Sequence, residues 1–342
     1  MTTLTSPHDL LAAIPFLVGY HPKESLVLVS LKNDAVGMAM RVDYPRSVEG
    51  LSVSLEILVG HLSREGADGA LIVAYMPDGR DDGVDILQSL NKSLEEAKII
   101  VHESIVIWQN KWRSLLCADQ LCCPPEGREL PELETSRIAV EQVANGHPMP
   151  FGNAEELTES ISSLPLAEDV NFSAEVRSFY LDENSDDLPN LQRKAAVGVI
   201  DLASRFISGS IGKDFALDQS LSAAVIGRMT DIHVRDFALG SHAEATADIY
   251  WSMWRYLARI APAGFVAPVA SLLAALSYEK GDGALAHRAL DRALSDDPTY
   301  SLALLLRRVF SAGWPPESFA QMRKDLHPKV CAAIFDGTNP RT

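Results

Sequence analysis

Short apolar runs are separated by amphipathic segments in the first third of the chain. Residues 26–31 and 70–75 are almost continuously apolar and have the length of strands that are buried on both faces. Residues 105–108 form a third run of this kind, and residues 38–43 alternate between large apolar side chains and small or polar ones. We therefore predict a β-sheet in which residues 38–43 pair with residues 26–31 through a turn at positions 33–34.

Helical spacing of apolar residues separates these strands. Residues 51–62 and 84–94 carry leucine or valine every three or four positions, which is typical of amphipathic helices, and Asp82 stands where it can cap the second helix. A tight turn at 110–111 is expected to lead into a further strand at 112–117. The order of strand, strand, helix, strand, helix, strand and strand indicates a mixed sheet with helices packed on it.

A short helix is expected at the start of the chain. Ser6 is a suitable N-cap, and Pro7 suits the first helical position because proline lacks the N–H that would be unpaired there. We expect Pro15 and Gly19 to break this helix.

The strand pattern stops after Pro124, and from residue 191 onward the chain consists of predicted helices. Three of them, at 265–279, 284–294 and 299–310, are separated by short connections rich in glycine and proline. Such connections are typical of antiparallel helices that stack on one another. The second half is therefore expected to be all-α.

A weak repeat signal lies in this second half. Ala286, Leu290, Ala293 and Pro298 have the spacing of the second helix of a tetratricopeptide unit, and Tyr278 lies near the place of its first-helix aromatic residue. Only one such unit can be seen, whereas a free-standing array needs about three. A repeat-like stack and a plain helical bundle with small residues at its helix contacts both fit.

Together these patterns predict three regions. Residues 1–130 form an α/β domain with a mixed sheet, residues 131–189 form a helical, acidic connector, and residues 190–342 form an α-helical, repeat-like domain. The length of 342 residues and the hydrophobic content of 47% are sufficient for two domains with cores of their own.

Charge and composition narrow the classes of partner. The formal net charge is −16, and residues 155–187 contain ten acidic residues and one basic residue. A field of this sign repels phosphate groups, so we expect no nucleic-acid partner and no anionic membrane partner, and the plain interpretation of the segment is a solvated linker. The chain has no apolar run of 18 residues and no basic, apolar start, so we expect a cytoplasmic protein without a membrane span.

Three of the four cysteines, Cys117, Cys122 and Cys123, lie within seven positions. Thiolates bind zinc and iron–sulfur clusters, but no second Cys-x-x-Cys pair follows, so His102 or His147 would have to complete a site. Burial in the core is the usual state of free cysteine and is our default interpretation. Metal binding and a reactive thiol are the two alternatives.

A second candidate is the acidic loop that contains Asp78, Asp81 and Asp82. It lies between a predicted strand and a predicted helix, where α/β proteins often bind ligands, and its carboxylates could hold a divalent cation. The spacing is not that of a calcium loop, and a solvated turn with Asp82 as a helix cap explains the same residues.

The stretch from Ser208 to Lys213 lacks the residues of a phosphate-binding loop and is expected to follow a helix. We therefore reject a phosphate-binding loop at this position.

Five segments together resemble the domain-of-unknown-function family numbered 4192: residues 10–31, 41–45, 112–127, 281–286 and 297–303. The resemblance covers most of the chain. It implies the two-part architecture predicted above and a bacterial, mainly actinobacterial, setting. It implies no activity, cofactor or catalytic residue.

Two hypotheses for function follow. The first is a non-catalytic interaction or scaffold protein whose helical domain presents a concave or flat surface to a protein partner. Four aromatic residues in one predicted helix could serve as anchors, although core packing is the plainer explanation for them: Tyr250, Trp251, Trp254 and Tyr256. The second hypothesis is an enzyme or a small-ligand or metal-binding protein with its site at the cysteines or at the acidic loop. The sequence assigns no catalytic residue, no cofactor and no oligomeric state.

Overall fold

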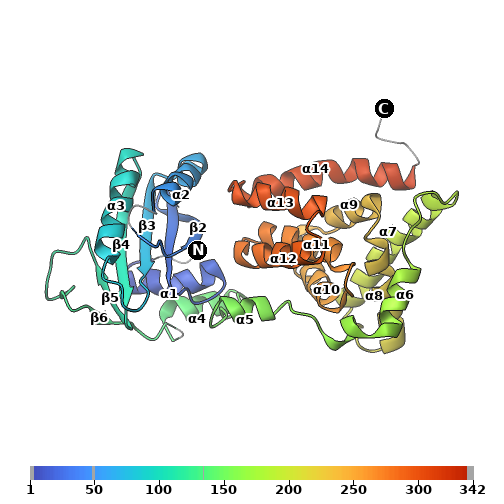
Figure 1. Cartoon of the computed structure of the whole chain (residues 1–342), viewed down its shortest axis with the longest axis horizontal. Coiled ribbons are helices and arrows are strands. Elements are labelled where there is room, and N and C mark those ends of the chain that lie inside the picture. Colours follow the sequence, from blue (N-terminus) through green and yellow to red (C-terminus); the bar gives the residue numbers. More distant parts are fainter. Residues whose placement is uncertain (1–3, 48–50, 134, 337–342) are drawn as a thin grey trace. The chain divides into compact units, whose positions relative to one another are not determined.

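The computed structural model describes residues 4–47, 51–133 and 135–336, except for the side chains of 51–54. The chain divides into two compact units, Met1–Leu157 and Thr158–Thr342. The division falls inside the segment predicted as a connector. Figure 1 shows the sheet in the first unit and the helices that make up the second.

The N-terminal unit is built on one mixed sheet, as the hydrophobic pattern predicts. The observed strand order is β2-β1-β3-β4-β5-β6, and the short strand β6 is not predicted by the pattern. β3 and β4 are parallel and are joined through a helix, whereas every other neighbouring pair is antiparallel. The strands are β1 (Ser25–Lys32), β2 (Ala35–Asp43), β3 (Gly69–Tyr75), β4 (Ile100–Trp108), β5 (Lys111–Ser114) and β6 (Arg128–Glu129).

Two helices, α2 (Leu51–Glu65) and α3 (Gly83–Glu96), pack on the sheet through their leucine faces. β1, which lies between β2 and β3, is buried at every position but its last, which explains its continuous apolar run. The shared core contains side chains from β1, β3, α2 and α3: Leu26, Leu28, Ile72, Leu58, Leu62, Leu87 and Leu90. Three more helices complete the unit: α1 (Pro7–Val18), α4 (Arg137–Ala144) and α5 (Ala154–Glu159).

Both hairpins of the sheet turn through two residues with positive φ. Asn33 and Asp34 have φ of 50° and 63°, and Gln109 and Asn110 have φ of 45° and 63°. Two-residue turns of this kind match the twist of the strands, and asparagine and aspartate tolerate positive φ better than most residues. The second turn therefore lies one residue before the predicted position.

Two sequence-based boundaries are wrong. The first helix does not break at Pro15 but continues to Val18 and ends at Gly19, which has a φ of 87°. Burial of Leu11 and Ile14, worth about 1.5–3 kcal/mol each, offsets the hydrogen bond that proline cannot make. The strand predicted at 112–117 ends at Ser114, because the Ser114 hydroxyl accepts hydrogen bonds from the next backbone N–H groups.

The second unit is all-α, as predicted. Its helices are α6 (Val170–Ser178), α7 (Leu188–Ile207), α8 (Phe215–Arg228), α9 (Ile232–Gly240), α10 (Ala247–Ile260), α11 (Val266–Glu279), α12 (Gly283–Asp296), α13 (Ser301–Ser311) and α14 (Pro316–Phe335). A short 3₁₀ turn, Pro165–Glu168, precedes α6, and a second one, Glu244–Thr246, lies between α9 and α10.

Helix α11 is the centre of this unit, and every residue from Val266 to Tyr278 is buried. α11 and α12 form a helical hairpin, in which the repeat positions Ala286, Leu290 and Ala293 are fully buried. The first residues of α11 and α13, Val266 and Ser301, stand 35 positions apart, close to the 34-residue tetratricopeptide period. However, α9, α10, α13 and α14 also contact α11, so this helix offers no open concave groove.

The aromatic residues of α10 belong mainly to the core. Tyr250 and Trp254 are buried, and the Nε1 of Trp251 donates to the Oγ of Ser277 at 2.9 Å.

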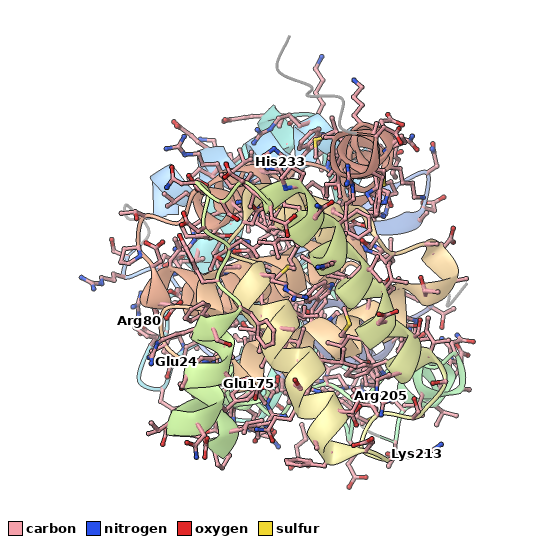
Figure 2. The ribbon with its side chains drawn as sticks, turned by 90° about the vertical axis from the view of Figure 1, so that its right-hand side faces the viewer. Glu24, Arg80, Glu175, Arg205, Lys213 and His233 are labelled. Carbon is pink, nitrogen blue, oxygen red and sulfur yellow. The ribbon has the colours of Figure 1, made fainter. Side chains whose placement is uncertain are left out.

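The loop after α7 is held by Arg205, labelled in Figure 2, which pairs with the buried Asp218 of α8. Asp218 also accepts a hydrogen bond from the backbone N–H of Gly212 at 2.6 Å, so the glycine-containing loop serves to connect two helices.

Candidate metal centre

The sulfur atoms of Cys117, Cys122 and Cys123 all lie within 4.8 Å of one another. Three thiolates around a tetrahedral zinc ion, with zinc–sulfur bonds of about 2.3 Å, would stand roughly 3.8 Å apart. The observed separation therefore needs only a small contraction to hold such an ion. Cys123 is buried, Cys117 is half-buried and Cys122 is exposed, so the group lies at the surface with one side covered.

Ser114 bends the chain into this loop at the end of β5. Its hydroxyl donates to the Oε1 of Glu103 at 2.6 Å and lies 3.3 Å from the backbone nitrogens of both Leu116 and Cys117, which donate to it. These bonds replace the ladder bonds of a longer strand. They explain why β5 stops before the first cysteine.

Asp119 shapes the second half of the loop. Its carbonyl oxygen accepts from the N–H of Cys123 at 2.7 Å, and its carboxylate accepts from the N–H of Leu121 at 2.8 Å. The guanidinium of Arg128 donates to the carbonyl oxygen of Leu121 at 2.8 Å. The chain therefore turns between Asp119 and Cys123. Because it is not extended there, the adjacent Cys122 and Cys123 can approach the same point.

Gly127 closes the loop against the sheet. It has a φ of 77°, and a Cβ atom there would lie 2.6 Å from the indole ring of Trp108. Its N–H donates to the carbonyl oxygen of Pro124 at 2.9 Å. Only glycine combines this conformation with this close contact.

Burial dominates the electrostatics of the buried sulfur. It raises the pKa of the Cys123 thiol to about 11, and the neighbouring Cys117 and Cys122 thiols act in the same direction. Without a metal, Cys123 is thus protonated at neutral pH. This opposes nucleophilic chemistry by Cys123, whereas a bound cation would supply the positive charge that a thiolate needs.

No fourth ligand joins the group among the His, Cys, Asp and Glu side chains that the structure describes. The two histidines named above, His102 and His147, are outside it. His102 packs beside Gly69 on the neighbouring strand, and His147 is exposed after α4. An ion held here would complete its coordination with water or with an external ligand.

The acidic loop has a different arrangement. Asp82 forms an ion pair with Arg80 and accepts a hydrogen bond from the hydroxyl of Tyr44 at 3.1 Å. Burial alone would raise the pKa of Asp82, but these two hydrogen bonds lower it, so the carboxylate is engaged as an anion. Asp82 precedes α3 without a capping hydrogen bond, and Asp78 and Asp81 are exposed. Within the described residues the three aspartates do not form a metal-binding group.

Sequence reasoning found the three cysteines but missed Ser114 and Asp119, which position them. Serine and aspartate often bond backbone N–H groups two or three residues further on, and this tendency is the signal that could have identified both. The fourth cysteine, Cys331, lies on α14, where its sulfur is 3.4 Å from the Nε2 of His327.

Comparison with known proteins identifies the family but no characterised relative. No curated protein and no solved structure matches the chain. Among the described residues, no helix is both long enough and apolar enough to cross a membrane. One family model matches residues 7–317, which is most of the chain. The chain therefore belongs to the family described as a domain of unknown function, DUF4192.

Proposed function

We propose that this protein binds a metal ion, zinc in the first place, through Cys117, Cys122 and Cys123. The observation that carries the proposal is the convergence of the three sulfur atoms within 4.8 Å. Buried cysteines that serve only as packing have no reason to gather in a loop whose neighbours Leu116 and Leu121 are 49% and 90% exposed.

The donor set favours zinc over other metals. Thiolates are soft ligands that select zinc, copper(I) and iron–sulfur clusters, and a cluster is normally held by four cysteines. Three thiolates with one open position are compatible with a zinc ion that carries an exchangeable fourth ligand.

Elemental analysis of the purified full chain tests the proposal. We expect about one zinc per chain in the wild type and in Cys331→Ser, and less than about a tenth of an ion in Cys122→Ser. Cys122 is exposed, so its replacement should leave the fold intact, and Cys331→Ser is the matched control because Cys331 is outside the cluster. A wild-type protein that stays metal-free after incubation with zinc and removal of the excess would refute the proposal.

A second proposal concerns the helical unit, which we expect to bind a protein partner. The support is a row of exposed apolar residues along α7, namely Val197, Ile200 and Ile207, together with Phe215 at the start of α8. The aromatic residues of α10 contribute little to this surface because they are mostly buried.

Affinity purification with the full chain tests this second proposal. A specific partner should be recovered with the wild type and with Leu305→Ser, which changes an exposed apolar residue on α13, but not with Ile200→Ser. Equal recovery with the wild type and both variants would exclude the α7 surface as the binding site.

The four cysteines are all unpaired, so we propose a reducing compartment, the cytoplasm, as the place of action.

A further inference from the structure

A polar cleft of about 410 Å³ opens in the N-terminal unit, away from the cysteines in sequence. Its walls come from the loop before β1, the end of β2, Pro77 after β3, and residues 153–155. The carboxyl ends of parallel strands are where open α/β sheets bind ligands, and Pro77 lies two residues after Tyr75, the last residue of β3. The volume is within the range of small-molecule sites.

Backbone hydrogen bonds hold the walls of this cleft together. The N–H of His21 donates to the carbonyl oxygen of Phe151 at 2.9 Å, and the N–H of Phe151 donates to that of Gly19 at 3.0 Å. The N–H of Tyr44 donates to the carbonyl oxygen of Glu24 at 2.9 Å. Segments that are more than a hundred residues apart in the sequence therefore form one preformed site.

Glu24, labelled in Figure 2, has a strained backbone conformation, with a φ of 44°. A glutamate adopts positive φ rarely, since its Cβ then crowds the following carbonyl group. Strain of this kind is found preferentially at ligand sites, where the surrounding structure maintains it. Here it coincides with a side chain that lines the cleft.

The cleft carries both signs of charge. Its cationic or titratable donors are His21, Lys23 and Arg41, and its carboxylates are Glu24, Asp43 and Glu155. An anion would be repelled by three carboxylates, and a cation would be repelled by Lys23 and Arg41. A ligand with both charges satisfies both sets of groups.

Arg41 provides a specific unoccupied position. Its Nη1 pairs with Asp43, and its Nη2 makes only a long contact of 3.5 Å with the carbonyl oxygen of Lys23. Its Nε is buried, and no residue within the described ranges accepts its proton. Because Nε is buried, the donor that remains for a ligand in the cleft is Nη2, which can form a charge-assisted hydrogen bond with a carboxylate.

We propose that this cleft binds a small zwitterion, an α-amino acid or a short peptide. The ligand's carboxylate bonds the Nη2 of Arg41, close to Lys23, and its ammonium group faces the carboxylates of Glu24 and Glu155. This site is independent of the cysteines, so zinc binding and zwitterion binding can be tested separately.

Ligand-observed NMR on the full-length wild-type chain tests the proposal with the twenty standard L-amino acids and dialanine as probes. We expect at least one of these to bind. For that ligand, blocking the amine by acetylation or the carboxylate by amidation should each weaken binding about tenfold or more, because each removes charge-assisted hydrogen bonds. Glucose of equal concentration serves as a neutral polar control. Binding of glucose without any zwitterion, or no binding at all, would overturn the proposal.

Three variants assign the binding to the cleft. Arg41→Met should weaken binding about tenfold or more, whereas Arg64→Met, on α2 and outside the cleft, should leave it unchanged. Glu24→Gly removes the carboxylate and also the backbone strain, so its melting temperature should equal or exceed that of the wild type while binding weakens. Binding that survives both Arg41→Met and Glu24→Gly would place the ligand elsewhere and refute the assignment.

Discussion

Arg323 on α14 and Glu279 at the end of α11 form a buried ion pair with two hydrogen bonds. Arg323 donates from Nε to Oε1 of Glu279 at 2.6 Å and from Nη2 to Oε2 at 3.1 Å, and the side chains are only 3% and 8% exposed. The Nε2 of His242 lies 3.1 Å from the same carboxylate, and Arg323 also donates to the carbonyl oxygens of Gly240 and His242. This cluster links α9, α11 and α14, so it selects one packing of these helices.

Removing one member of this pair should destabilise the protein strongly. Arg323→Met leaves Glu279 as a buried charge with one partner fewer, and we expect a loss of about 3–5 kcal/mol in the free energy of unfolding. The double variant Glu279→Leu, Arg323→Met should recover most of that loss, since it leaves no unpaired charge. Urea denaturation of the wild type, the single variant and the double variant measures their free energies of unfolding. As a control, Lys280→Met breaks a solvent-exposed pair with Asp248 and should cost less than about 1 kcal/mol.

The same carboxylate should contribute to acid sensitivity. Burial alone would raise the pKa of Glu279, but hydrogen bonds from His242 and Arg323 outweigh it and lower the pKa below the ordinary value of 4.5. A lowered pKa in the folded state stabilises the protein above pH 4.5, and this contribution is lost as the pH falls through the folded-state pKa. Glu279→Gln should therefore be less stable than the wild type at pH 7, and the difference should shrink towards pH 3. A difference that stays constant with pH would contradict this explanation.

Local patterns were sufficient to predict most of the fold. The continuous apolar run of β1 and the spacing of small residues in α12 each correspond to the burial that the structure shows. The mixed sheet follows from the order of these elements. Pro15 was misjudged because a proline rule considers only the backbone, whereas the burial of the surrounding apolar side chains depends on the rest of the unit.

The sites could be predicted only in part. The cysteine cluster is local, so its residues could be named from the sequence, but their convergence depends on hydrogen bonds made by Ser114 and Asp119. The polar cleft was missed because it joins the segment around His21 to residues 153–155, which no local pattern connects. The sequence predicts Asp82 as a helix cap, but its carboxylate instead pairs with Arg80 and accepts a hydrogen bond from Tyr44.

Two helical glycines should respond oppositely to alanine. A Cβ atom at Gly227 of α8 would lie 2.3 Å from the carbonyl oxygen of Val176 on α6, whereas at Gly198 of α7 the nearest atom lies at an ordinary 3.6 Å. We expect Gly198→Ala to stabilise the protein by about 0.5–1 kcal/mol, because alanine favours the helix. Gly227→Ala should destabilise it, since α6 and α8 must separate. Thermal denaturation compares the two variants, and equal melting temperatures would argue against the close contact between α6 and α8.

Gly127 and Gly79 provide a matched pair for the cysteine loop. Their φ angles are 77° and 76°, but a Cβ atom at Gly127 meets the ring of Trp108 at 2.6 Å, and one at Gly79 has no described atom within 4 Å. Alanine at either position costs about 1–2 kcal/mol in backbone strain. Only Gly127→Ala should also displace the loop and reduce zinc content, which elemental analysis measures. If the two variants retain the same zinc, the packing of Gly127 on Trp108 does not position the cysteines.

The buried thiol of Cys123 should be the slowest of the cluster to react in the metal-free protein. Its pKa is raised to about 11, so at pH 8 only about a thousandth of it is the reactive thiolate. Cys122, the adjacent residue, is exposed and should be alkylated first by iodoacetamide, as tandem mass spectrometry of the shared peptide can resolve.

Zinc must displace the proton from Cys123, so the apparent affinity of the protein for zinc should increase as the pH rises from 6 to 8. Added zinc should also protect all three thiols of the cluster, but not Cys331, from alkylation. Alkylation of Cys123 as fast as that of Cys122 would show that the sulfur is not buried. Alkylation that zinc does not slow would show that the cluster does not bind the ion.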